Sequence, residues 1–435
     1  MDHLRTLVAD EVVSQKAAQV SQVKKIHYAW IVFAITFVAL IVAAGVRSAP
    51  SILIVPLENE FGWSRATISF AVSINLLMYG LIGPFAAALM NRFGVRRIML
   101  FAFVLIAAGV STTAFMYKPW QLQLLWGFGV GTGAGTVALV MGATVVNRWF
   151  YRHRGLLIGI LTASTATGQL LFLPLLAKLV EGHGWRAVTW CVAAAAVSLV
   201  PLAIFFVKDD PVPLGLRPFG LPDDESLSAP VQRNPLADAL SGLFLGLRSR
   251  DFYMLAGTFF ICGATTNGLV GTHLVPACMD HGIQEVQAAG LLAVMGVFDL
   301  IGTTASGWLS DRFNNRLLLF IYYGLRGLSL LYLPYAFGHG SYSLGWFAVF
   351  YGLDWIATVP PTLALTTQAF GRERATVLFG WILAAHQIGA ALAAYGAGYL
   401  RSTEGHYDHA FFVSAALCLV AAVAVLRPTF STVKR

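Results

Sequence analysis

The stretch Gly307-Trp-Leu-Ser-Asp-Arg-Phe-Asn-Asn-Arg316 is a short polar, basic segment between two apolar runs. Each run is long enough to cross a bilayer, which takes about 20 residues of helix. A weaker relative of this segment, Ala87-Ala-Leu-Met-Asn-Arg-Phe-Gly-Val-Arg96, lies between two earlier apolar runs. Asn91 and Asp311 hold matching places in the two segments, 220 positions apart (311 − 91).

The same offset recurs at the start of two further apolar runs. Arg154 and Gly155 open one of them, and Arg374 and Ala375 open the other, again 220 positions later (374 − 154). A shared offset near half the chain length is typical of a duplicated bundle of helices. The pattern predicts an all-α membrane protein with twelve transmembrane helices in two pseudo-symmetric bundles of six, with both polar segments on one side of the membrane.

Composition excludes a soluble domain. The chain has 435 residues, of which 57% are hydrophobic and only 11% charged, and its mean hydropathy is +0.70. In soluble domains about a quarter of the residues are charged. The net charge of +8 reflects topology rather than a nucleic-acid partner, because 22 of the 29 Lys and Arg residues lie in the tails and in alternate loops. This bias predicts that both termini face the cytoplasm. We expect the chain to lie in the inner membrane of a bacterial cell.

One long polar, proline-rich segment divides the chain into halves. We expect a cytoplasmic tail over 1–26, a six-helix bundle over 27–207, a cytoplasmic linker over 208–252, a second bundle over 253–427 and a tail over 428–435. Within the linker, Leu236–Leu247 is amphipathic.

Several function classes find no support in the sequence. The glycine-rich run Gly127–Gly135 suggests a nucleotide loop, but it follows no strand, so we interpret its glycines as positions of close helix packing. The four cysteines are scattered and predict neither a disulfide nor a metal site. We expect no cofactor, no enzymatic activity and a protein that works as a monomer.

The polar segment resembles the loop motif Gly-x-Leu-Ala-Asp-Arg-x-Gly-Arg-Lys of the major facilitator superfamily at Gly307, Leu309, Asp311, Arg312 and Arg316. In that family the motif lies between helices 2 and 3 and again between helices 8 and 9. The resemblance implies the same twelve-helix fold. It also implies structural or gating roles for the motif residues Asn91, Arg92, Asp311 and Arg312. Asn91 stands where the motif has a carboxylate, which predicts weaker charge pairing in the first copy.

Five ionisable residues fall inside the predicted helices, where each is costly unless it faces a cavity or finds a partner: Arg47, Asp299, Arg326, Asp354 and His386. Arg47 offers a forked donor that suits a carboxylate, although it could instead extend to the membrane interface. A lone carboxylate such as Asp299 is a candidate proton carrier. Its alternative role is a structural ion pair with Arg326.

The remaining polar residues inside the predicted helices also have candidate roles. We interpret Arg326 as a structural partner of Asp299 or Asp354, with substrate contact as the alternative, and Asp354 as a second candidate for proton coupling. His386 and Gln387 lie on a helix that lines the cavity in this fold, so they are candidates for substrate binding or for hydrogen bonds between helices. Asn267 is a candidate lining residue next to Thr265 and Thr266.

Two further stretches resemble the monocarboxylate porters and the related oxalate:formate antiporters. Trp149–Gly159 looks like the helix-5 signature of the porters, with an aromatic pair, then basic residues, then Leu-x-x-Gly. Helix 1, with Arg47 and Pro50, and the turn Phe61-Gly-Trp-Ser-Arg65 are also similar. In that family a basic residue on helix 1 and an aspartate on helix 8 serve substrate and proton, and Asp299 falls on the aspartate position.

Two departures from that family concern the anion site. The family has an arginine four residues after the aspartate, where this chain has Thr303, and a lysine after the helix-1 proline, where it has Ser51. The resemblance as a whole implies a proton-coupled symporter of a small organic anion, with a monocarboxylate as the first candidate. A proton-driven exporter of hydrophobic compounds and a sensor that signals through the linker are the alternatives.

Overall fold

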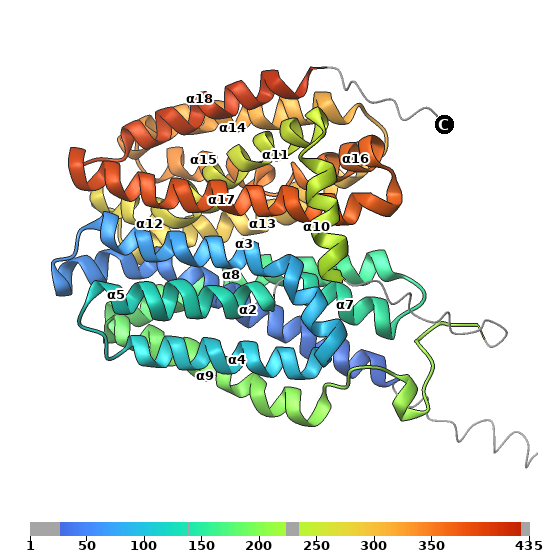
Figure 1. The fold of residues 1–435 in the computed structure, drawn as a ribbon. Coiled ribbons are helices and arrows are strands. Elements are labelled where there is room, and N and C mark those ends of the chain that lie inside the picture. Colours follow the sequence, from blue (N-terminus) through green and yellow to red (C-terminus); the bar gives the residue numbers. More distant parts are fainter. Residues whose placement is uncertain (1–26, 138, 223–234, 428–435) are drawn as a thin grey trace, which may run out of the picture.

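The computed structural model describes residues 27–137, 139–222 and 235–427. Helices make up almost all of this part of the chain, and twelve helical stretches in it are long and apolar enough to cross a membrane. They form two layers, one from each half of the chain (Figure 1). The prediction of twelve transmembrane helices is confirmed.

The N-terminal half holds the first six stretches. Its helices are α2 (Tyr28–Phe61), α3 (Arg65–Phe93), α4 (Val95–Thr113), α5 (Pro119–Leu122), the π-helical η1 (Gln123–Val130), α6 (Gly131–Thr136), α7 (Leu139–Trp149), α8 (Arg154–His183) and α9 (Trp185–Phe206). The four pieces from α5 to α7 form one stretch.

The C-terminal half repeats this plan. Its helices are α11 (Arg250–Gly263), the π-helical η3 (Ala264–Val270), α12 (Gly271–Asp280), α13 (Glu285–Ser310), α14 (Asn315–Phe337), α15 (Ser341–Asp354), α16 (Val359–Phe370), α17 (Arg372–Glu404) and α18 (Asp408–Val425). The linker contributes the short η2 (Val212–Leu214) and α10 (Pro235–Gly246), and α10 forms in the stretch that we expected to be amphipathic. The two predicted tails, 1–26 and 428–435, lie outside the described residues.

At two places a proline does not mark the end of a helix. α2 continues to Phe61 past Pro56. It ends only at Gly62, which adopts the left-handed conformation (φ 66°) that glycine tolerates. The tenth transmembrane helix is interrupted before rather than at its proline pair, because Pro360 and Pro361 occupy the first turn of α16, where proline fits.

Close helix approach depends on glycine at several crossings. A Cβ atom on Gly131 or Gly135 would lie 2.8 Å or less from the backbone of α3. This contact confirms the packing role predicted for the glycine-rich run. In the C-terminal half, a side chain on Gly302 would collide with the backbone carbonyl of Leu353 at the end of α15.

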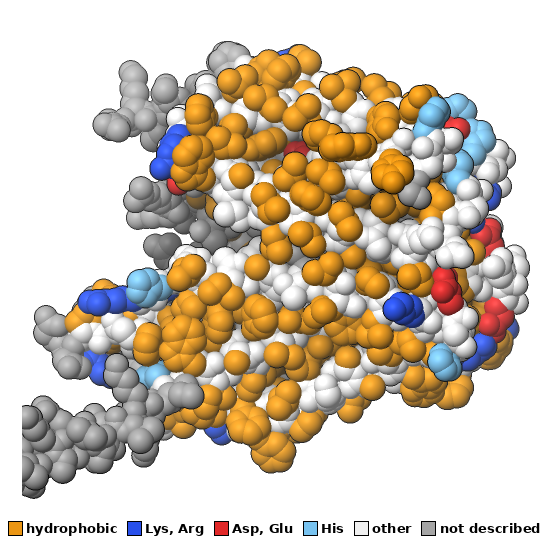
Figure 2. All heavy atoms as spheres, turned by 180° about the vertical axis from the view of Figure 1, so that it is seen from behind, with side chains coloured by type: hydrophobic (Ala, Val, Ile, Leu, Met, Phe, Trp, Pro, Cys, Tyr) orange, Lys and Arg blue, Asp and Glu red, His pale blue; other side chains and the backbone are white. Residues whose placement is uncertain are grey.

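The two halves meet along three pairs of helices, which are α3 with α17, α8 with α13 and α2 with α12. α10 contacts both α3 and α17, and lies across the two halves at one end of the molecule (Figure 1). We call this the linker end. Apolar side chains cover the middle of the surface, while most charged side chains gather toward the two ends (Figure 2), as expected for a protein surrounded by lipid.

We predict that Gly302→Ala lowers the apparent melting temperature in detergent, because the added methyl group overpacks the α13–α15 crossing at a cost of ~1–3 kcal/mol. Gly290 lies on the same helix with open space at its Cβ position, so Gly290→Ala is the matched control and should melt like the parent protein. Equal melting temperatures for the two variants would contradict this packing account.

Candidate functional site

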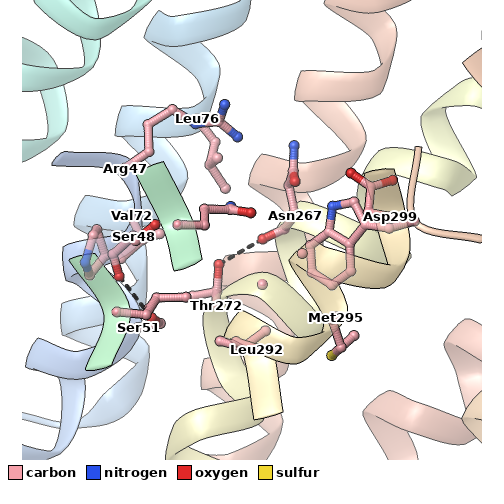
Figure 3. A pocket seen from close by; sticks show the side chains of 16 residues that line it. Arg47, Ser48, Ser51, Val72, Leu76, Asn267, Thr272, Leu292, Met295 and Asp299 are labelled. Carbon is pink, nitrogen blue, oxygen red and sulfur yellow. Dashed lines mark hydrogen bonds between the residues drawn. The ribbon is translucent and has the colours of Figure 1, made fainter. Parts of the chain in front are cut away.

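A small cavity lies between the two halves, and Figure 3 shows its lining. Its volume is about 50 Å³, room for roughly three to five water molecules. The lining comes from α2, α3 and α8 on one side and from η3, α12, α13 and the turn after α15 on the other. Seven of the 16 lining residues carry polar or charged side chains: Arg47, Ser48, Ser51, Gln169, Asn267, Thr272 and Asp299.

Arg47 brings a positive charge to this cavity. Its guanidinium lies 4.5 Å from the centre of the Tyr79 ring, and its Nη1 donates a hydrogen bond of 3.3 Å to the Tyr79 hydroxyl. No described carboxylate lies within ion-pair distance of Arg47. A cation held against an aromatic ring and facing a polar cavity has its charge available for an anion. The structure therefore places Arg47 toward the cavity rather than at the membrane interface.

Asp299 lines the cavity from the opposite half. Its Oδ1 accepts hydrogen bonds of 2.9 Å from the Thr303 hydroxyl and from the backbone N–H of Ile356. The Ile356 N–H is available because the tenth transmembrane helix is interrupted between α15 and α16. Thr303, which stands where the resembling family has an arginine, thus supplies a neutral donor to this carboxylate.

Arg326 pairs with Asp354 rather than with Asp299. Its Nε lies 2.6 Å from Asp354 Oδ2, and its Nη1 donates to the sulfur of Cys262 at 2.9 Å. Its Nη2 donates to the backbone carbonyls of Asp354 and Trp355. Arg326 and Asp354 are buried, and neither lines the cavity. Of the two partners expected from the sequence for Arg326, the structure therefore selects Asp354.

The other predicted site residues divide between the cavity and the helix interfaces. Asn267 lines the cavity, where its backbone carbonyl accepts a hydrogen bond from Thr272. His386 and Gln387 are buried outside the lining, against Gly263 and Gly80 respectively. His386 Nδ1 and Gln387 Oε1 have no hydrogen-bond partner, so the structure leaves their predicted role in substrate binding untested.

Some lining residues were not expected from the sequence. Thr272 and Trp355 belong to the cavity, although no pattern in the sequence singled them out. Their only signals are the helix interruptions beside them, at η3 and between α15 and α16. Conversely, Thr265 and Thr266 donate to backbone carbonyls of their own helix and do not line the cavity.

The motif residues lie away from the cavity, at the linker end. Asn91 Oδ1 accepts a hydrogen bond of 2.8 Å from Arg148, whose guanidinium also lies 3.6 Å from Asp210 of the linker. A linker carboxylate therefore supplies the charge that Asn91 lacks. In the second copy, the Arg312 guanidinium lies 4.2 Å from the centre of the Trp308 ring. Arg92 and Asp311 are exposed.

Comparison with known proteins finds relatives that match nearly the whole length of this chain. The uncharacterized MFS-type transporter YcxA of Bacillus subtilis is 27% identical over 396 residues, covering 90% of this chain and 92% of the relative. Monocarboxylate transporter 13 of Rattus norvegicus is 28% identical over 396 residues, covering 90% and 87%.

Two solved structures share the fold. A bacterial homolog of the human lysosomal transporter Spinster, in an inward-facing and unoccupied conformation, has a TM-score of 0.71 at 16% identity, covering 94% of this chain and all of the other. A D-xylose-proton symporter has a TM-score of 0.71 at 15% identity, covering 92% and 98%. The sequence model of the Major Facilitator Superfamily matches residues 35–394 and 280–434. The chain is therefore a multi-pass membrane protein that belongs to the Major Facilitator Superfamily of transporters.

Proposed function

We propose that this transporter moves a small organic anion, with a monocarboxylate as the first candidate, together with a proton by alternating access. The observation that carries the proposal is Arg47, a cation in a central cavity with no carboxylate partner among the described residues. A guanidinium in such a place can form two parallel hydrogen bonds to one carboxylate. The charge of the cargo would then compensate the cost of this partly buried cation.

The rest of the cavity suits a small polar cargo. The hydroxyls of Ser51 and Thr272 and the amide of Gln169 line the same cavity as Arg47. The two hydroxyls donate to backbone carbonyls and so offer acceptors, while the amide offers donors and an acceptor to the remainder of a short acid. The volume of about 50 Å³ is far below the several hundred Å³ of a drug-sized pocket. The cavity in this conformation therefore favours the anion transporter over an exporter of hydrophobic compounds.

Asp299 is our candidate for the proton carrier. It faces the same cavity from the other half, and its hydrogen-bond partners, Thr303 and Ile356 N–H, are neutral. A carboxylate without a cationic partner in a poorly hydrated site can change its protonation state as the cavity opens and closes. Asp354 is a weaker candidate, because Arg326 holds it in a buried ion pair.

One relative and one protein of the same fold support the proposed class. One is named a monocarboxylate transporter, and one protein of the same fold is named a proton symporter. We further propose that the linker end faces the cytoplasm of a bacterial cell, with both termini on that side, since the Lys and Arg residues concentrate there. The protein would act as a monomer in the inner membrane, with lipid as its surroundings.

Arg47→Ala should reduce uptake of the transported acid by more than tenfold, because loss of a buried charge partner costs on the order of 2–5 kcal/mol. Uptake of a panel of labelled acids, including lactate and pyruvate, into proteoliposomes measures this. Arg186→Gln is the matched control, since Arg186 pairs with Glu60 at a half-exposed site and neither residue lines the cavity. Competition by lipophilic cations but by no acid would contradict the anion proposal and support the exporter.

Asp299→Asn should abolish the stimulation of uptake by an inward proton gradient while leaving exchange of labelled for unlabelled acid at equal pH on both sides. The amide keeps the size of the side chain but cannot carry a proton. Parallel measurements of gradient-driven uptake and equal-pH exchange in proteoliposomes separate the two effects. Unchanged gradient-driven uptake in this variant would remove Asp299 as the proton carrier.

Asp354→Asn should act on stability instead. The substitution leaves the Arg326 guanidinium buried without a counter-charge, at a cost of about 3–5 kcal/mol, whereas Asp299→Asn removes no ion pair. Thermal unfolding in detergent should therefore show a much larger loss of apparent melting temperature for Asp354→Asn. If both variants melted alike and Asp354→Asn alone lost proton coupling, the roles assigned to these two aspartates would be reversed.

A further inference from the structure

A cluster of charged side chains joins the two halves at the end of the molecule opposite the linker end. Arg65, the first residue of α3, has a side chain that is only 4% exposed. Its Nη1 and Nη2 each donate a hydrogen bond of 2.7 Å to one carboxylate oxygen of Asp280, the last residue of α12. This forked contact crosses from the N-terminal to the C-terminal half.

Each partner of this contact has a second ion pair within its own half. Arg65 Nε donates to Glu58 Oε2 at 2.7 Å, and both residues belong to the N-terminal half. Arg401 Nε donates to Asp280 Oδ2 at 2.7 Å, and both belong to the C-terminal half. The four side chains carry two positive and two negative charges, and Tyr407 completes the cluster by accepting from Arg65 at 3.1 Å.

This arrangement makes the contact between halves breakable. If the halves separate at this end, the Arg65–Asp280 pair is lost, but Glu58 stays with Arg65 and Arg401 stays with Asp280. No unpaired charge is then left behind, which avoids the large penalty that follows when a buried ion pair loses one partner. A purely structural contact would not need a replacement counter-charge on both sides.

The cluster is also coupled to the cavity by two continuous helices. Ser51 and Glu58 lie on α2 seven residues apart, and Thr272 and Asp280 lie on α12 eight residues apart. At 1.5 Å per residue the cluster lies roughly 10–12 Å beyond the cavity. The helices that line the cavity thus end at the cluster, so a movement of one half against the other must change both.

We propose that Arg65 and Asp280 form a reversible clamp that closes the cavity at this end, and that the clamp opens and re-forms in each transport cycle. Arg65 and Asp280 are positioning residues, since neither lines the cavity. The inference rests on alternating access from the proposed function but not on the identity of the cargo.

The test measures access to the cavity from the clamp side. A reporter cysteine replaces Gln169, which lines the cavity and is half-buried, in a Cys191→Ala background because the other three cysteines are buried. A membrane-impermeant maleimide is added to intact cells or oriented vesicles, and the labelling rate is followed by mass. Lys118→Cys, in the exposed turn between α4 and α5, identifies the side from which the reagent acts. Parallel samples without the reporter measure labelling of the native cysteines.

With the clamp intact, the reporter should react slowly from that side. Asp280→Asn should raise its labelling rate about tenfold, because it removes the charge-assisted contact that favours the closed state. Arg65→Lys keeps the charge but not the fork, so it should give a smaller rise and serves if Asp280→Asn does not fold. Arg65→Gln combined with Asp280→Asn should add little beyond the larger single effect, because both substitutions break the same pair.

Glu58→Gln is the matched control. It removes an ion pair of the same cluster that lies within one half and keeps the Arg65–Asp280 contact. Because Glu58 would otherwise compensate the charge of Arg65 after opening, the reporter should label no faster than in the parent. Equal labelling of the parent, folded Asp280→Asn and Arg65→Lys would overturn the clamp, as would a rise in Glu58→Gln as large as in Asp280→Asn. Labelling needs no cargo, so failure of every acid in the uptake assay would contradict the proposed substrate without affecting this result.

Discussion

The cost of placing a charge inside a bilayer governs the arrangement of this molecule. Each ionisable side chain at depth must find a counter-charge, a set of hydrogen-bond partners or a polar cavity. Arg326 finds Asp354 and three further acceptors. Asp299 finds a hydroxyl and a backbone N–H. Arg47 has only the face and hydroxyl of Tyr79, so its charge is the one that the described part of the fold leaves least compensated.

That difference separates scaffold from site. The Arg326–Asp354 pair fastens α14 to the end of α15 within one half, which makes it part of a rigid body. Arg47 and Asp299 belong to different halves and face one cavity. A cargo bound there would contact both halves at once. In this account, two events can shift the relative position of the halves. An anion compensates the charge of Arg47, and a proton neutralises Asp299.

The fold could be predicted from the sequence more fully than the site. The 220-residue offset between Asn91 and Asp311 predicted two equivalent bundles. After a duplication, equivalent loops keep the same separation in the sequence even where residues of the motif differ. Arg47, Asn267 and Asp299 were also found from the sequence, since polar residues in apolar runs are conspicuous. The partner of Arg326 could not be settled, because both candidate aspartates lie at a compatible depth and only packing decides between them.

Other features depend on geometry that no local pattern records. The π-helical segment Ala264–Val270 shifts the register of the seventh transmembrane stretch, so Asn267 reaches the cavity while Thr265 and Thr266 do not. The clamp was missed because Arg65 reads as an ordinary loop residue in the sequence. Its significance depends on Asp280, which lies 215 positions later.

The central claim is that the cavity binds a carboxylate through its charge. The most direct measurement is calorimetric titration of the purified protein with a transported acid and with its neutral amide, such as lactate and lactamide. The two ligands have nearly the same size and differ in the charge that Arg47 would meet. The account predicts that the acid binds to the parent protein, and that the amide does not bind measurably. Equal binding of acid and amide, or binding of the acid that is unchanged in Arg47→Ala, would contradict it.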